Sequence, residues 1–156
     1  MRPYAHAIYC DDIRDEVGGK STLVGMYHGA LLVQSFPVTL PKLCVMLQVV
    51  LPAELAPDGL KIKIMKDGEL LAEGEMSLPK FEAAMAAIPE EERGAEASQE
   101  KAWVVASNFI FSPLKLDGPG VISAWVEAGS REIKANGLRI GQVSGRPASD
   151  PAAPRQ

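Results

Sequence analysis

Apolar side chains recur at every second position along most of this chain, which is the pattern of extended strands. Short β-prone runs, separated by Gly, Pro and Asp, follow one another along nearly the whole sequence. The first two, Tyr4–Cys10 and Ser21–His28, flank a charged segment, 11–20, that contains a double glycine. We therefore expect two antiparallel strands joined by a loop at 11–20, with Tyr4 opposite His28 and His6 nearby.

Two of the runs, Lys42–Leu51 and Ala102–Phe111, are apolar on both of their faces. A strand with this pattern is covered on both sides in the folded protein. Since a single short helix can cover only one of them, we expect one sheet face to be buried against another subunit. This excess of apolar surface predicts a homo-oligomer.

The period changes once, near residues 78–88, where Phe81, Ala84, Met85 and Ile88 follow helical spacing. Pro79 in the first turn and Pro89 as a stop favour one short amphipathic helix. The charged segment 90–101 that follows is typical of a solvated loop. Residues 143–156 are rich in Pro and Ala, without an apolar period, and are expected to form a disordered tail.

The order of these elements predicts the fold class. Strands follow one another without the βαβ alternation of a parallel sheet, and the sequence has no internal repeat. We therefore expect a mainly all-β domain at residues 1–142, an antiparallel β-sandwich of about eight or nine strands, immunoglobulin-like or C2-like. A partly closed barrel is the second choice.

Composition narrows the function classes. The chain has 156 residues, of which 47% are apolar and 23% charged, as in ordinary globular proteins. Its net charge of -4 disfavours a nucleic-acid partner, and it has no apolar run of the roughly 20 residues that a membrane span needs. We expect a cytoplasmic protein. Cys10 and Cys44 are interpreted as buried reduced thiols, although a bridge stays open if their strands are neighbours.

Two stretches carry a family resemblance: C-D-D-I-R-D-E-V-G-G-K-S-T-L-V-G-M-Y and, further on, P-V-T-L-P-K-L. They resemble a family of small bacterial and prophage-encoded proteins of unknown function, and the likeness runs from about Tyr4 to Ile140. The resemblance implies a single β-domain of bacterial or phage origin. It brings no activity, so no functional residue is carried over from it.

The charged segment and the residues beside it are the predicted binding site of a non-enzymatic protein. The expected role is binding or structural support, through a protein partner or self-association and without a cofactor. The candidate residues, drawn from along this segment and from the end of the strand after it, are Asp11, Asp12, Arg14, Glu16, Lys20, Tyr27 and His28.

The alternative is a metal- or small-ligand-binding domain, possibly hydrolytic, that uses the carboxylates of the same segment. Asp11, Asp12, Asp15 and Glu16 offer the hard oxygen ligands that Ca²⁺ prefers. Neighbouring cations and ordinary turn chemistry account for the same acids. His6 and His28 alone are too few for a typical zinc shell, and none of the common catalytic motifs occurs in the sequence.

Overall fold

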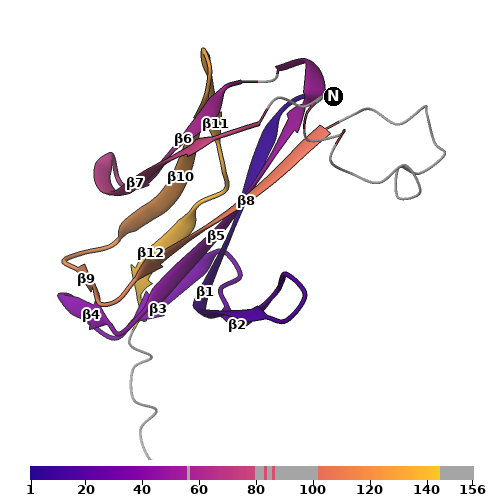
Figure 1. Cartoon of the computed structure of the whole chain (residues 1–156). Helices are drawn as coiled ribbons and strands as arrows, with labels where there is room; N and C mark the ends of the chain where they lie inside the picture. Colours follow the sequence, from indigo (N-terminus) through magenta and orange to yellow (C-terminus); the bar gives the residue numbers. More distant parts are fainter. Residues whose placement is uncertain (56, 80–82, 84–85, 87–101, 145–156) are drawn as a thin grey trace, which may run out of the picture.

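The computed structural model describes residues 1–55, 57–79, 83, 86 and 102–144, and shows two sheets packed face to face (Figure 1). A four-stranded sheet has the order β2-β1-β5-β8. A larger sheet has the order β3-β12-β10-β6-β7, with β11 paired to β10, and β4 pairs with β9 in a small third sheet. All of these pairs are antiparallel except β12 with β3.

Of the described strands, ten belong to the two main sheets and two form the small third sheet. The four-stranded sheet consists of β1 (Tyr4–Glu16), β2 (Lys20–Met26), β5 (Leu43–Pro52) and β8 (Ala102–Phe111). The larger sheet consists of β3 (Ala30–Val33), β6 (Gly59–Lys66), β7 (Glu69–Ser77), β10 (Gly120–Ala128), β11 (Arg131–Lys134) and β12 (Leu138–Gln142). The short pair is β4 (Val38–Leu40) with β9 (Leu114–Leu116), and a 3-10 turn, η1, covers Ala53–Leu55.

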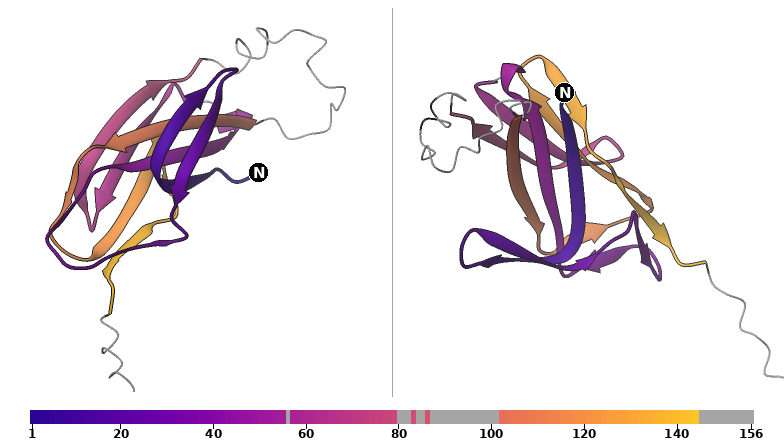
Figure 2. Two further views of the ribbon diagram at one scale, coloured as in Figure 1. Left: turned by 90° about the horizontal axis from the view of Figure 1, so that it is seen from below. Right: turned by 90° about the vertical axis from the view of Figure 1, so that its right-hand side faces the viewer.

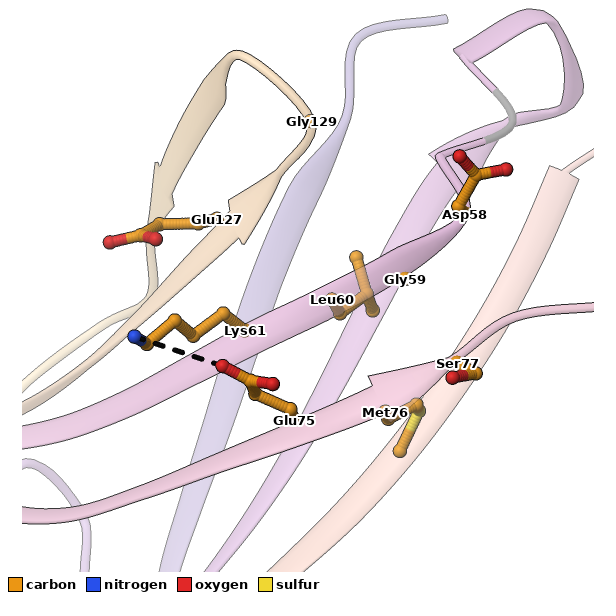
Figure 3. A pocket seen from close by; sticks show the side chains of 9 residues that line it. All are labelled: Asp58, Gly59, Leu60, Lys61, Glu75, Met76, Ser77, Glu127 and Gly129. Carbon is orange, nitrogen blue, oxygen red and sulfur yellow. Dashed lines mark ion pairs between the residues drawn. The ribbon is translucent and has the colours of Figure 1, made fainter.

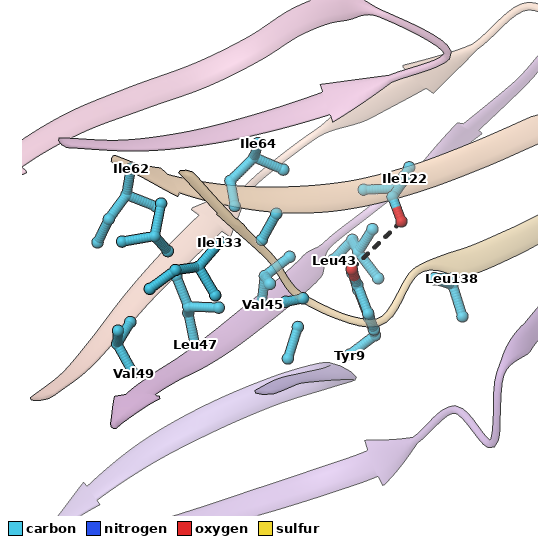
Figure 4. Packing of buried hydrophobic residues seen from close by; sticks show 14 of the residues in the cluster. Tyr9, Leu43, Val45, Leu47, Val49, Ile62, Ile64, Ile122, Ile133 and Leu138 are labelled. Atoms are coloured by element: carbon cyan, nitrogen blue, oxygen red, sulfur yellow. Dashed lines mark hydrogen bonds between the residues drawn. The ribbon is translucent and has the colours of Figure 1, made fainter. Parts of the chain in front are cut away.

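The core lies between the two sheets and is built from alternate residues of their strands (Figure 4). On β5, Leu43, Val45, Leu47, Val49 and Leu51 all point inward and are at most 1% exposed. Tyr9 is the polar exception: its hydroxyl donates hydrogen bonds to the carbonyl oxygens of Ile122 and Asn136, at 3.2 and 2.9 Å. One aromatic side chain therefore joins the two layers through its ring and through its hydroxyl.

The predicted class, an antiparallel β-sandwich, is confirmed. The described residues form twelve strands rather than eight or nine, because short segments such as β4 and β9 also pair. Of the helix expected at 78–88, only residues 78, 79, 83 and 86 are described, and the loop at 90–101 and the part of the tail beyond residue 144 lie outside the described residues. Within the described part, no helix has the length and apolar character required to cross a membrane.

The predicted pairing of the first two strands is wrong. Cys10 lies opposite Met26 and Glu16 opposite Lys20, so the hairpin closes much later in β1 than expected. Tyr4 and His6 instead face Val50 and Gln48 of β5. The two histidines therefore do not share a site. Segment 11–20 is also no loop, since only residues 17–19 form the turn and the rest belong to strands.

Candidate functional site

β1 changes its partner half-way along its length. Residues Tyr4–Cys10 pair with β5, and from Cys10 to Glu16 the strand pairs with β2. The second half and β2 leave the sandwich as a two-stranded ribbon that projects from one end of the four-stranded sheet (Figures 1 and 2). We call residues 11–25 the arm. At its tip, Gly18 and Gly19 adopt φ of 85° and 71°, and Val17 is 94% exposed.

Asp12 anchors the arm to the body. Its carboxylate accepts a hydrogen bond from Lys42 Nζ at 2.8 Å and another from Arg14 Nε at 3.3 Å. Lys42 directly precedes β5, so this contact ties the start of the arm to a central strand. The hydrogen bond from Lys42, followed by that from Arg14, lowers the pKa of the Asp12 carboxyl. The same contact raises the pKa of Lys42.

Asp11 makes a second anchor, on the opposite side of the ribbon. The Tyr27 hydroxyl donates a hydrogen bond to its carboxylate at 2.5 Å. Burial, and then this hydrogen bond, raises the pKa of Tyr27 to about 12. Gly25 leaves the room that the carboxylate needs: its φ is +67°, and a Cβ there would lie 2.2 Å from Asp11 Oδ2. A residue with a side chain is thus excluded on conformation and on space.

The two thiols lie at the base of the arm. Cys10 and Cys44 face each other across β1 and β5, are fully buried and are not joined by a disulfide. Cys10 Sγ is 3.4 Å from the carbonyl oxygen of Asp12, and Cys44 Sγ is 3.8 Å from that of Asp11. Burial is the largest cause of the raised pKa of both thiols. They act as packed, weakly hydrogen-bonded side chains where β1 leaves β5.

The predicted site residues are brought to one arm but not to one point. Side chains alternate along a strand, so Asp12, Arg14, Glu16 and Lys20 lie on the side opposite Asp11. Asp11, Asp12 and Glu16 each have a partner of their own, and Glu16 accepts a hydrogen bond from Thr22 Oγ1 at 2.9 Å. His28 is exposed beyond the end of β2. Among the described residues, no group of three or more His, Cys, Asp or Glu side chains is arranged to hold a metal.

A second surface adjoins the arm: the outer side of the four-stranded sheet. The strand registers place its side chains in four rows, none of which carries a formal charge when His is neutral. Several of its apolar members are exposed, including Tyr4 at 53%, Val104 at 66% and Ile110 at 58%. We call this surface the uncharged face. Its rows are Tyr4–Val50–Val104, His6–Gln48–Ala106, Ile8–Met46–Asn108 and Met26–Cys10–Cys44–Ile110.

The outer side of the larger sheet is very different. Two of its rows are charged at every position but one: Glu73–Lys63–Trp125–Lys134 and Glu75–Lys61–Glu127–Glu132. Lys61 pairs with Glu73 and Glu75 at 3.6 and 3.8 Å, Lys63 pairs with Glu127, and Lys134 Nζ lies 4.8 Å from the centre of the Trp125 ring. We call this surface the charged face.

A shallow pocket at the end of the charged face is lined by Lys61, Glu75 and Glu127 (Figure 3). Its lysine is already paired with a glutamate, as the dashed line in Figure 3 marks. An exposed ion pair of this kind contributes little energy. We therefore place the candidate site on the uncharged face and the arm.

Two parts of this site were absent from the sequence-based prediction. Lys42, the partner of Asp12, lies 30 positions away and becomes its neighbour only through the β1–β5 register. The apolar pattern on both faces of β5 and β8 predicted that their outer side would be covered. That the same surface continues over β1 as far as Met26 could be known only from the pairing of β1 with β5. The alternation of Tyr4, His6 and Ile8 is the sequence signal that could have revealed this continuation, since these residues lie opposite the outward residues of β5.

Acid is expected to loosen the arm. The folded pKa of Asp12 is depressed, so its contacts contribute stability above the ordinary aspartate pKa of about 3.9. This contribution is lost as the pH falls through the folded value. NMR titration should show Asp12 titrating below a typical Asp, and Lys42→Met should move its pKa upward. Lys115→Met is the control, because that lysine pairs with exposed Asp117; an unchanged Asp12 titration in Lys42→Met would contradict the anchor.

The comparison with protein families covers most of the chain. Residues 5–141 match the model of a family of unknown function, DUF6941. The chain belongs to the DUF6941 family. The match runs from β1 to β12 and includes the arm and both outer faces, and it confirms the resemblance to an uncharacterised family. No curated protein and no solved structure matches this chain.

Proposed function

We propose that this DUF6941 protein is a non-enzymatic binding or structural accessory protein, which works by docking a protein on the uncharged face beside the arm. The contrast between the two outer faces carries the proposal. In a chain with 23% charged residues, two rows of one outer face are charged at all but one position, whereas the four rows of the uncharged face carry no formal charge. Apolar surface of this extent marks an interaction site.

The arm adds specificity to this surface. It presents Arg14, Glu16 and Lys20 on the side that continues the uncharged face through Cys10 and Met26. An apolar patch bordered by charged residues has the anatomy of a protein interface. The carboxylates of the alternative, a metal- or small-ligand-binding site, lie on both sides of the ribbon, and those of Asp11, Asp12 and Glu16 each have a hydrogen-bond partner. This arrangement favours protein binding.

The cellular setting is part of the proposal. A bacterial or prophage origin is supported by the resemblance noted above. A cytoplasmic location fits two buried thiols that remain free although they face each other across neighbouring strands.

A pull-down with the purified full chain from a lysate of the source cells tests the proposal. We expect the wild-type chain and Leu70→Glu, which adds a charge to a 49% exposed leucine on β7, to retain the same identified proteins. Val104→Glu should no longer retain these proteins. The binding of each identified protein is then measured again with the purified protein and the purified chain. Val104 is 66% exposed, so the charge can reach water and the fold should be retained. Equal retention by both variants would refute docking on this face.

A further inference from the structure

We propose that the occupant of the uncharged face is a second copy of this chain, which makes the protein a two-fold homodimer. This inference rests on the proposed function and names its partner. Identical chains each carry a net charge of -4 and repel one another through most of their surface. The uncharged face lets two copies meet without placing like charges against each other.

The charged face is a poor alternative for this contact. A second copy docked there would desolvate Lys61, Lys63 and their glutamate partners, which already form ion pairs. Burying such charges costs more than their mutual attraction returns unless the new geometry is excellent. Of the other exposed apolar side chains, Leu32, Val121 and Val143 line one shallow pocket beside β12, whereas the uncharged face extends over β1, β5 and β8 and reaches β2 only at Met26, beyond the fully buried Cys10 and Cys44.

The size of the surface also fits a dimer. Three strands about 4.8 Å apart, with four rows about 7 Å apart, cover about 400 Å² before side-chain roughness is counted. The arm projects from the lower end of the same sheet in the right-hand view of Figure 2, and it adds about 200 Å² to the surface area available for contact. A specific interface buries about 800 Å² per partner, so the face and arm together approach that requirement.

Symmetry explains why a single patch suffices. In a two-fold dimer the same surface is used by both partners, so one uncharged face covers the other and no equivalent patch stays open. The central rows, which contain His6, Gln48, Ala106, Met46 and Asn108, supply apolar contact together with neutral hydrogen-bonding groups. Neutral polar groups can pair with the same groups of a second copy, which like charges cannot.

Sedimentation velocity on the full chain tests the inference directly. Over about 1 to 100 μM, the range in which weak to moderate dimers dissociate, the wild type should approach twice the 16.7 kDa of one chain. Val104→Glu should raise the dissociation constant at least tenfold, and Leu70→Glu should leave it unchanged. A wild type that stays monomeric, or a dimer insensitive to Val104→Glu, would overturn the inference.

Thiol labelling supplies a second measurement that does not depend on the effect of a charge. In Ala106→Cys the new thiol lies within a central row, and we expect a maleimide to label it more slowly as the protein concentration rises. In Leu70→Cys labelling should not depend on concentration. The wild type corrects for Cys10 and Cys44, which are fully buried. Concentration-independent labelling in Ala106→Cys would contradict the dimer.

The two proposals can fail separately. A monomeric wild type whose capture of another purified protein is lost in Val104→Glu overturns the second copy but retains the proposed function. A monomer that also keeps its capture in Val104→Glu overturns both. A dimer disrupted by Val104→Glu supports both, with self-assembly as the binding event.

Discussion

Leu47→Ala should lower the free energy of unfolding by about 3 to 5 kcal/mol, the range typical of large core truncations. Leu47 is fully buried in the middle of β5, which pairs with β1 on one side and β8 on the other. The substitution leaves a cavity, and the strands on both sides of β5 keep the surrounding side chains from moving in to fill it. Urea denaturation at neutral pH measures the change.

The next residue of the same strand provides the control. Gln48 points to the uncharged face and is exposed, so Gln48→Ala should alter the free energy of unfolding by no more than about 0.5 kcal/mol at a concentration where the chain is monomeric. Comparable losses in Leu47→Ala and Gln48→Ala would show that the two faces of β5 are not assigned correctly.

Asn136→Ala should cost about 2 kcal/mol of stability. The Asn136 side chain accepts a hydrogen bond from Ala7 N at 2.8 Å and donates one to Ala7 O at 2.9 Å. Pairing of β1 with β2 begins later in the strand, so this side chain takes the place of a missing neighbouring strand. Its removal leaves one donor and one acceptor of a buried residue without their protein partners, at about 1 kcal/mol or more each.

Gln142→Ala is the matched control for this change. Gln142 Nε2 donates one exposed hydrogen bond to Gln34 O, and its loss should cost no more than about 0.5 kcal/mol. Hydrogen exchange adds a local measurement, since the Ala7 amide should exchange faster in Asn136→Ala. Stability and Ala7 exchange equal to those of the wild type would show that water replaces the asparagine without loss.

The sequence predicted the class of fold because strand alternation is a local property. Lys42–Leu51 and Ala102–Phe111 correspond closely to β5 and β8. Segment 11–20 lacks the apolar alternation that predicts a strand, because a ribbon with water on both sides has no need of an apolar face. The charged side chains therefore predict a loop, although the backbone there is extended. Without that part of β1, the only available pairing placed Tyr4 opposite His28.

The hairpin of β6 and β7 shows a second limit of local reasoning. On the sequence alone, a three-residue loop at residues 66–68 is favoured, because it places Ile64 opposite Leu70 and keeps apolar side chains together on one face of the hairpin. The structure has a two-residue turn, with φ of 49° at Asp67 and 87° at Gly68, and an irregularity between Ile64 and Met65. The shift places Ile64 opposite Ala72. A bulge re-registers side chains without leaving a clear pattern in sequence.

The candidate site was predicted in part. The residues of the arm were singled out, and so was the apolar character of the outer side of β5 and β8. Their interpretation as one charged loop was not correct, because the partners of Asp11 and Asp12 come from outside it, from Tyr27 and Lys42. Contacts across strands depend on register, which short-range patterns do not determine.

The position of β12 has a consequence for biosynthesis. This strand lies between β10 and β3, and within the described residues β3 has no other ladder partner. β3 must therefore wait for β12, which is synthesised more than a hundred residues later. Until release of the C-terminal part of the chain, the nascent protein exposes Leu31 and Val33, and chaperone contact is expected at that stage of synthesis.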